Sequence, residues 1–101
     1  MKKQHLTIIW EGIAIDVVYI PEYSPGFTKT YGWRMAHLCI KRQDKGQLPM
    51  TETGYKSHFT NAANIEEIGG TESYVRALLD EYGSSKKWKE YAAKERQMTL
   101  F

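Results

Sequence analysis

Apolar and polar residues alternate along the first part of the chain, which is the pattern typical of β-strands. The apolar positions fall at every second residue on both sides of the dipeptide Glu11-Gly12: Leu6, Ile8, Trp10, Ile13, Ile15, Val17 and Tyr19. Glycine readily takes the positive φ that a two-residue hairpin turn needs. A hairpin closed at this dipeptide has one apolar and one mixed face, because it pairs Trp10 with Ile13 and Thr7 with Asp16. The sequence therefore predicts an antiparallel hairpin over residues 5–19.

A third strand is predicted over residues 33–42. Its alternation separates two sets of side chains, Ala36, Leu38 and Ile40 against Met35, His37 and Cys39. A polar turn follows at residues 43–46. Residues 48–51 are predicted to form a short edge strand, since Pro49 cannot donate a hydrogen bond inside a sheet.

Residues 21–32 predict a long connection between these strands, because they contain two prolines and two glycines. Three of their rings recur at a spacing of four: Tyr23, Phe27 and Tyr31. One interpretation is an aromatic binding loop that also carries Lys29. The other is an ordered loop whose rings fold over the open end of the sheet, since exposed aromatic rings lower solubility.

The C-terminal part has the period of helices. Asn61 is a candidate cap for a helix that Gly69-Gly70 ends, and Thr71 is a candidate cap for a second helix over residues 71–83. The second helix has an apolar stripe, Val75, Leu78, Leu79 and Tyr82, and an exposed pair, Arg76 and Asp80. A last helix, capped by Ser84 or Ser85, places three residues on one face: Trp88, Tyr91 and Ala92.

These elements predict an α+β fold: a three- to four-stranded antiparallel sheet with C-terminal helices packed on one face. Residues 1–96 would form a single domain, and residues 97–101 a tail. The expected core consists of apolar residues from the strands and from two helices: Leu6, Ile8, Ile13, Ile15, Val17, Leu38, Ile40, Val75, Leu78, Leu79 and Trp88.

The composition of the chain argues against several classes of function, as its length, charge and cysteine content show. A chain of 101 residues fits one domain, and a net charge of +2 is too small to draw nucleic acid by bulk attraction. The single Cys39 excludes an intrachain disulfide and a cysteine-based zinc site. Because the start of the chain lacks the apolar run of a signal peptide and no stretch is long enough to span a membrane, a cytoplasmic protein without membrane contact is expected.

The sequence predicts neither catalysis nor a cofactor. Ser57 and His58 are adjacent, so on a strand they point to opposite faces and cannot form a nucleophile–base hydrogen bond. His5, His37 and His58 lie on separate segments, so no metal site is expected. The chain also lacks a glycine-rich phosphate-binding loop.

Four lysines surround two rings on the last helix: Lys86, Lys87, Lys89 and Lys94 around Trp88 and Tyr91. Cations that neutralise phosphates and rings that stack on bases are used in single-strand nucleic-acid binding. Both rings, however, fall on the face expected to be buried, so nucleic-acid binding ranks third among the hypotheses.

Residues 47–59 form the densest polar and aromatic stretch. The run Leu-Pro-x-Thr-Glu-Thr-Gly-Tyr-x-Ser-His-Phe resembles one found in short proteins of bacterial plasmids and phages, and the likeness covers most of the chain. It implies a mobile-element origin. Its side chains Tyr55, Lys56 and His58, together with Tyr23, Phe27 and Tyr31, make a candidate secondary surface for a partner.

The last five residues are Gln97, Met98, Thr99, Leu100 and Phe101. They resemble the Gln-Leu-Ser/Asp-Leu-Phe pentapeptide with which bacterial proteins dock on the DNA polymerase sliding clamp. The resemblance implies that Gln97 hydrogen-bonds at the rim of a groove and that Leu100 and Phe101 fill an apolar pocket. Alternatively, Leu100 and Phe101 fold back and cap the sheet.

The leading hypothesis is a non-enzymatic protein-binding accessory of a mobile element that docks on the host sliding clamp through this tail. The alternative is a small phage-type inhibitor of a host defence nuclease, comparable to an anti-CRISPR protein, that binds through its sheet face or aromatic loop.

Overall fold

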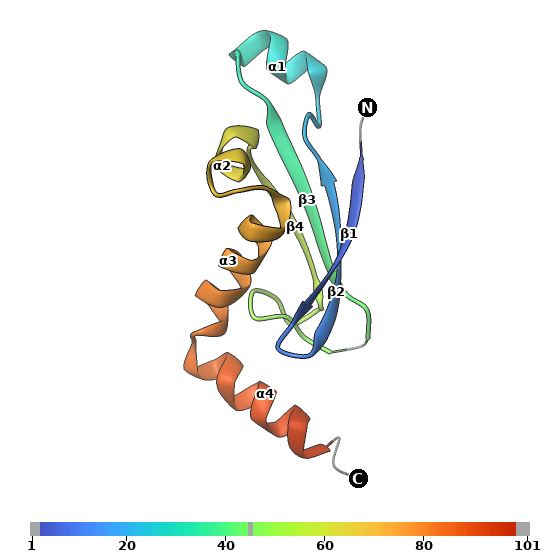
Figure 1. Ribbon diagram of the computed structural model, residues 1–101, viewed down its shortest axis with the longest axis vertical. Coiled ribbons are helices and arrows are strands. Elements are labelled where there is room, and N and C mark those ends of the chain that lie inside the picture. Colours follow the sequence, from blue (N-terminus) through green and yellow to red (C-terminus); the bar gives the residue numbers. More distant parts are fainter. Residues whose placement is uncertain (1–2, 45, 99–101) are drawn as a thin grey trace.

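The computed structural model describes residues 3–44 and 46–98, with the side chains of residues 96–98 outside that description. The chain runs through four strands and four helices in these residues (Figure 1): β1 (Gln4–Trp10), β2 (Ile13–Ile20), α1 (Pro25–Tyr31), β3 (Met35–Arg42), β4 (Tyr55–Asn61), α2 (Ala62–Glu67), α3 (Thr71–Gly83) and α4 (Lys86–Met98).

The four strands form one antiparallel sheet in the order β1-β2-β3-β4. The N-terminal hairpin has the expected register, with Trp10 opposite Ile13 and Thr7 opposite Asp16. Glu11 and Gly12 have φ of 49° and 78°, so both turn residues are left-handed, as in a type I′ turn. The helices α2 and α3 lie along one side of the sheet (Figure 1). The predicted α+β fold is confirmed.

The core lies between the sheet and these helices. The predicted core residues are buried, apart from Leu6 and Leu78, which are half-buried. Among the described residues, the prediction omitted six further hydrophobic residues of the core: Trp10, Tyr19, Ala36, Leu48, Ala62 and Ile65. Tyr82, the last member of the predicted helical stripe, is 49% exposed and does not belong to the core.

The connection between β2 and β3 is not a loop throughout, because it contains α1. Ser24 caps this helix by accepting a hydrogen bond from the Phe27 N–H at 3.2 Å, and Pro25 occupies its first turn. Gly32 ends it with φ of 80°. The spacing of four between the aromatic residues is therefore a helical spacing, and the Phe27 and Tyr31 rings lie 4.5 Å apart.

The fourth strand is β4, and the prediction of a strand over residues 48–51 is wrong. Leu48 and Thr51 form two backbone hydrogen bonds with each other, of 3.0 and 3.1 Å, which close a turn. Gly54, with φ of 75°, precedes β4. β4 cannot be recognised from alternating apolar and polar residues, because this edge strand has polar and aromatic side chains on both faces.

Two of the three predicted helix caps are confirmed. The Asn61 side chain accepts from the Ala63 N–H at 2.9 Å, and the Ser85 hydroxyl accepts from the Trp88 N–H at 3.2 Å. Thr71 is instead the first residue of α3, after Gly70, whose φ is 114°. The predicted pair on α3 also differs, since Arg76 binds Glu72 at 2.8 Å.

The corner between α3 and α4 packs against the hairpin. The indole Nε1–H of Trp10 donates to Asp80 at 2.8 Å, and the Trp10 and Trp88 rings lie 5.8 Å apart. Gly83, the last residue of α3, is buried beside the Trp10 ring. Trp10 therefore joins the sheet to both C-terminal helices.

Candidate functional site

The sheet face opposite the core is the first candidate surface. Its residues alternate with the core positions, and none of them is buried: His5, Thr7, Ile9, Ala14, Asp16, Val18, Ile20, Met35, His37, Cys39, Lys41, Tyr55, Ser57, Phe59 and Asn61. We call this set the open face. It includes three strongly exposed apolar or aromatic residues, Ile9 at 58%, Tyr55 at 46% and Phe59 at 48%.

Three rings meet on the open face and form a cluster. Tyr23 lies 5.2 Å from the His37 ring and 5.1 Å from the Phe59 ring, and His37 lies 4.5 Å from Phe59. His37 and Phe59 are directly opposite each other on β3 and β4. The Tyr23 N–H donates to the Met35 carbonyl at 2.9 Å, which holds its ring over the two strands. We call these three rings the aromatic cluster.

The structure divides the predicted secondary surface into three groups. Tyr23 and Tyr55 belong to the open face or its cluster, whereas Phe27 and Tyr31 pack on α1, where Phe27 lies 4.7 Å from the Trp33 ring. Lys56 and His58 lie on the other side of the sheet, which the helices cover. Sequence reasoning omitted Phe59 and His37 as surface residues, because only the pairing of β3 with β4 brings them together.

His58 packs between β4 and α3. Its Nε2 lies 2.9 Å from the Tyr74 hydroxyl, and burial lowers the pKa of its imidazole below the usual 6.5, with Lys56 adding to the effect. Burial also lowers the pKa of His37. Protonating either ring in the folded protein is therefore less favourable than in the unfolded chain.

We predict that stability falls as the pH is lowered from about 7.5 to about 5, because the unfolded state binds more protons in this window. The measurement is the Tm at several pH values. His58→Gln, which keeps a polar group near Tyr74, should flatten the dependence. His5→Gln is the control, because His5 is exposed. A parent Tm that is constant over this range would contradict the prediction.

Ser57 is hydrogen-bonded to His37 and not to its neighbour His58. The Ser57 hydroxyl lies 2.6 Å from Nε2 of His37, across β3 and β4. Among the described residues no carboxylate binds the His37 ring, as a nucleophile–base–acid triad would require. Residues 3–44 and 46–98 also contain no group of three or more His, Cys, Asp or Glu side chains that could hold a metal ion.

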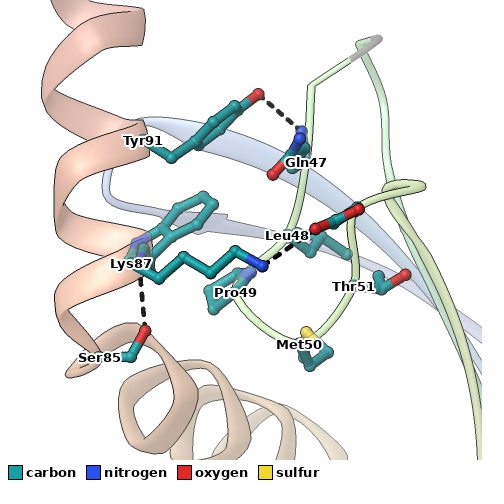
Figure 2. A pocket seen from close by; sticks show the side chains of 10 residues that line it. Gln47, Leu48, Pro49, Met50, Thr51, Ser85, Lys87 and Tyr91 are labelled. Atoms are coloured by element: carbon teal, nitrogen blue, oxygen red, sulfur yellow. Dashed lines mark hydrogen bonds and ion pairs between the residues drawn. The ribbon is translucent and has the colours of Figure 1, made fainter.

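A cleft of about 430 Å³ lies between the loop over residues 47–52 and the start of α4 (Figure 2). Leu48 and Trp88, which are 2% and 4% exposed, supply apolar walls. Lys87 reaches across from α4 to Glu52, at 3.0 Å. The loop is fixed to α4, since the Gln47 N–H donates to the Tyr91 hydroxyl at 2.9 Å.

The buried Arg42 side chain links the loop of the cleft to α4. Its side chain is 5% exposed and binds Asp44, Glu95 and the Gln47 carbonyl, the last at 2.9 Å. Burial alone would lower the pKa of Arg42, but the hydrogen bonds that its guanidinium donates to Asp44 and Glu95 outweigh burial and raise it. The Arg42 guanidinium likewise lowers the pKa of Asp44. The cleft therefore rests on a buried cation with two carboxylate partners.

The lysines of α4 are exposed, but the neighbouring rings are not. Trp88 is 4% exposed, and Tyr91 is half-buried with its hydroxyl bound to Gln47 and to Glu95 at 2.7 Å. Trp88 therefore has almost no exposed surface for stacking on a base, and Tyr91 is only partly exposed. The exposed lysines therefore support the nucleic-acid hypothesis, but the two rings beside them do not form an exposed platform on which bases could stack.

The predicted docking tail is described only in part. Gln97 and Met98 are the last two residues of α4, while Thr99, Leu100 and Phe101 lie outside the described residues. No helix in the described part of the chain has the length and apolar character needed to cross a membrane.

The chain matches the family model of the KlcB third domain over residues 3–88. It belongs to this family. KlcB is plasmid-associated, which agrees with the mobile-element origin implied by residues 47–59. The KlcB match includes the open face, the aromatic cluster and the cleft as far as Trp88, and it stops before Tyr91, Glu95 and the tail. Neither the curated proteins nor the solved structures contain a match to this chain.

Proposed function

We propose that this KlcB third-domain chain is a non-enzymatic protein-binding accessory of a mobile element. The observation that supports the proposal best is the open face with its aromatic cluster. Exposed apolar and aromatic side chains gathered on one face are characteristic of protein-contact surfaces, and Tyr and Phe are enriched at interface centres. Helices already cover the other face of the sheet (Figure 1), which leaves the open face free for a partner.

Several side chains of the open face are also held in place by their neighbours. The aromatic cluster is fixed by ring packing and by the hydrogen bond from Tyr23 to Met35. Asp16, the acidic side chain of this face, accepts from Thr7 at 3.1 Å and from Gln43 at 2.8 Å. A surface whose side chains are already ordered loses less conformational entropy on binding.

The proposed partner is the host sliding clamp, which the tail would bind through Gln97, Leu100 and Phe101. The direction of α4 supports this proposal, because α4 carries the chain away from the sheet toward one end of the molecule (Figure 1). An extended docking peptide would require Gln97 and Met98 to leave the last turn of α4. The cost is small, since the last carbonyls of a helix have no intrahelical partner.

The second candidate is an inhibitor of a host defence nuclease, which the open face favours because it is a ready contact surface that does not depend on the tail. The two candidates predict different sensitive residues. Clamp binding should depend on Leu100 and Phe101, and inhibition should depend on Tyr23 and Phe59.

One capture experiment separates the candidates, using purified clamp and a host lysate. Under the clamp proposal Leu100 and Phe101 serve as a docking peptide, so deleting them should abolish clamp binding and leave the Tm unchanged. Tyr23→Ser with Phe59→Ser should remove a partner bound by the open face. Tyr82→Ser is the matched control, since this exposed ring lies on α3. Clamp binding that survives the deletion would refute the clamp proposal, and unchanged capture by the double variant would refute the open-face proposal.

A further inference from the structure

The two edge strands of the sheet, β1 and β4, differ in how they are covered (Figure 1). Edge strands present unpaired N–H and carbonyl groups, and proteins usually protect them with charges, prolines, bulges or a covering segment. At one end of β1, α3 supplies such a cover, because Nη1 of Arg76 donates to the Ile9 carbonyl at 3.2 Å. β4 pairs with β3 at every position without a bulge, and it contains no proline or acidic residue. β4 is therefore the more open edge.

The ladder between β3 and β4 determines which backbone groups of β4 face outward. The Arg42 N–H donates to the Gly54 carbonyl at 2.9 Å, and the Ala62 N–H donates to the Arg34 carbonyl at 3.0 Å, one bond at each end of the strand pair. Hydrogen-bonded positions alternate along an antiparallel pair, so the even-numbered residues of β4 bond to β3. The odd-numbered residues turn their N–H and carbonyl groups toward the free edge: Tyr55, Ser57 and Phe59.

These outward-facing groups are open to a new strand. In the described part of the chain, no group binds the backbone of Ser57 or Phe59 at this edge, and the Tyr55 carbonyl accepts only from the Thr53 hydroxyl, at 3.2 Å. The side chain of Ser57 is exposed, and so are the two rings beside it, at 46% for Tyr55 and 48% for Phe59. An added strand would hydrogen-bond to the edge and cover part of both rings.

The sequence of β4 is complementary to itself. When two copies of β4 lie antiparallel about a twofold axis at Ser57, each outward-facing residue meets an outward-facing residue. Tyr55 of one copy lies opposite Phe59 of the other, and the symmetry makes this aromatic pair twice. Ser57 lies opposite itself, where its small side chain leaves room. On the core side Lys56 lies opposite His58, and because burial lowers the pKa of His58, like charges do not meet there at neutral pH.

The same construction on β1 gives a poorer match. Two copies of β1 that lie antiparallel about Thr7 place His5 opposite Ile9 and bring no aromatic pair together on the open face. The Ile9 carbonyl is also already bound by Arg76. Self-pairing is therefore favoured at β4 and not at β1.

We propose that this chain forms a homodimer in which the β4 strands of two copies pair edge to edge, antiparallel about Ser57. The two sheets then form one continuous sheet, and the two open faces lie on the same side of it. A second copy is favoured over an unrelated strand because Tyr55, Ser57 and Phe59 match themselves in this register. The homodimer does not rest on the function proposed above, since it needs no host protein.

Analytical ultracentrifugation of the purified chain over a wide range of concentrations tests the proposal. The average mass should rise from that of one chain, 11.7 kDa, toward twice this value. Ser57→Lys should weaken the dimer by about tenfold or more, because two lysines would face each other at the axis. Thr7→Lys is the matched control and should leave the dimer unchanged. Thr7 is also exposed on an edge strand, and each substitution removes one cross-strand hydrogen bond, to Asp16 or to His37. The Tm of each variant verifies that it is folded.

Disulfide cross-linking locates the interface. Opposite Cα atoms in a hydrogen-bonded antiparallel pair are about 5.5 Å apart, which a disulfide is able to span. Ser57→Cys should therefore give a covalent dimer under mild oxidation. The experiment uses a Cys39→Ser background, because Cys39 lies opposite Ser57 within the same chain. Thr7→Cys in this background should remain uncross-linked.

A mass of one chain at every concentration would overturn the proposal. Equal weakening by the two lysine substitutions would also overturn it, as would a covalent dimer from Thr7→Cys and none from Ser57→Cys. A monomeric chain that loses a lysate partner on Ser57→Lys would show that a strand of another protein occupies the edge, and the homodimer would again be wrong. Because the mass is measured without any host protein, failure of the homodimer is distinguishable from failure of the open-face function.

Discussion

Replacing Arg42 with methionine is expected to lower the free energy of unfolding by about 3 kcal/mol. The substitution keeps an unbranched side chain in a site that is 5% exposed, but it removes the partner of Asp44, Glu95 and the Gln47 carbonyl. Glu95 is 29% exposed, so its carboxylate would be left partly desolvated without a cation. The change is measured by urea unfolding monitored by circular dichroism.

Arg34→Met is the matched control. Arg34 also pairs with a glutamate, Glu66, but the two side chains are 42% and 60% exposed. Exposed ion pairs contribute about 1 kcal/mol or less. If the two substitutions were equally destabilising, the burial of Arg42 would have no special importance, and the proposed support of the cleft would be incorrect.

Gly83→Ala is expected to destabilise the protein by about 2 kcal/mol, although alanine is the better helix former. A Cβ at this position would lie 2.7 Å from Cζ2 and 2.8 Å from Cη2 of Trp10. The Trp10 ring is 5% exposed and held by Asp80 and Trp88, so it cannot move aside without disturbing the core. The measurement is again the free energy of unfolding.

Gly26→Ala gives the comparison within another helix. A Cβ on Gly26 would meet only the Ser24 hydroxyl, at 3.8 Å, so the substitution should stabilise the protein by about 0.5–1 kcal/mol. Effects of the same sign at both glycines would show that helix propensity, and not contact with Trp10, determines the result at Gly83.

The sequence was most informative where local chemistry agreed with the pattern. The hairpin followed from alternation plus a turn that Gly12 makes possible, and Asn61 and Ser85 cap their helices through the residue types that do so generally. The helix α1 was also signalled locally, by Ser24-Pro25 at its start and Gly32 at its end. The prolines and glycines of residues 21–32 are equally typical of a loop, so their presence does not distinguish a loop from a short helix.

Other features had no local signal. β4 is a strand because β3 pairs with it, and its own side chains show no apolar alternation. The contact of His37 with Ser57 depends on that register. The cleft depends on contacts between residues far apart in the chain, such as Gln47 with Tyr91 and Arg42 with Glu95. Neither composition nor periodicity predicts contacts between residues that lie so far apart in the sequence.

The order of the strands in the sheet has a consequence for synthesis on the ribosome. Each strand pairs with the strand next to it in the sequence, so the emerging chain is able to build the sheet one hairpin at a time. The helices that cover the core face, α2 and α3, come after all four strands. Until they emerge, the nascent sheet exposes Ile8, Ile15 and Leu38 as well as the open face, and in that interval the domain is most exposed to aggregation and to chaperones.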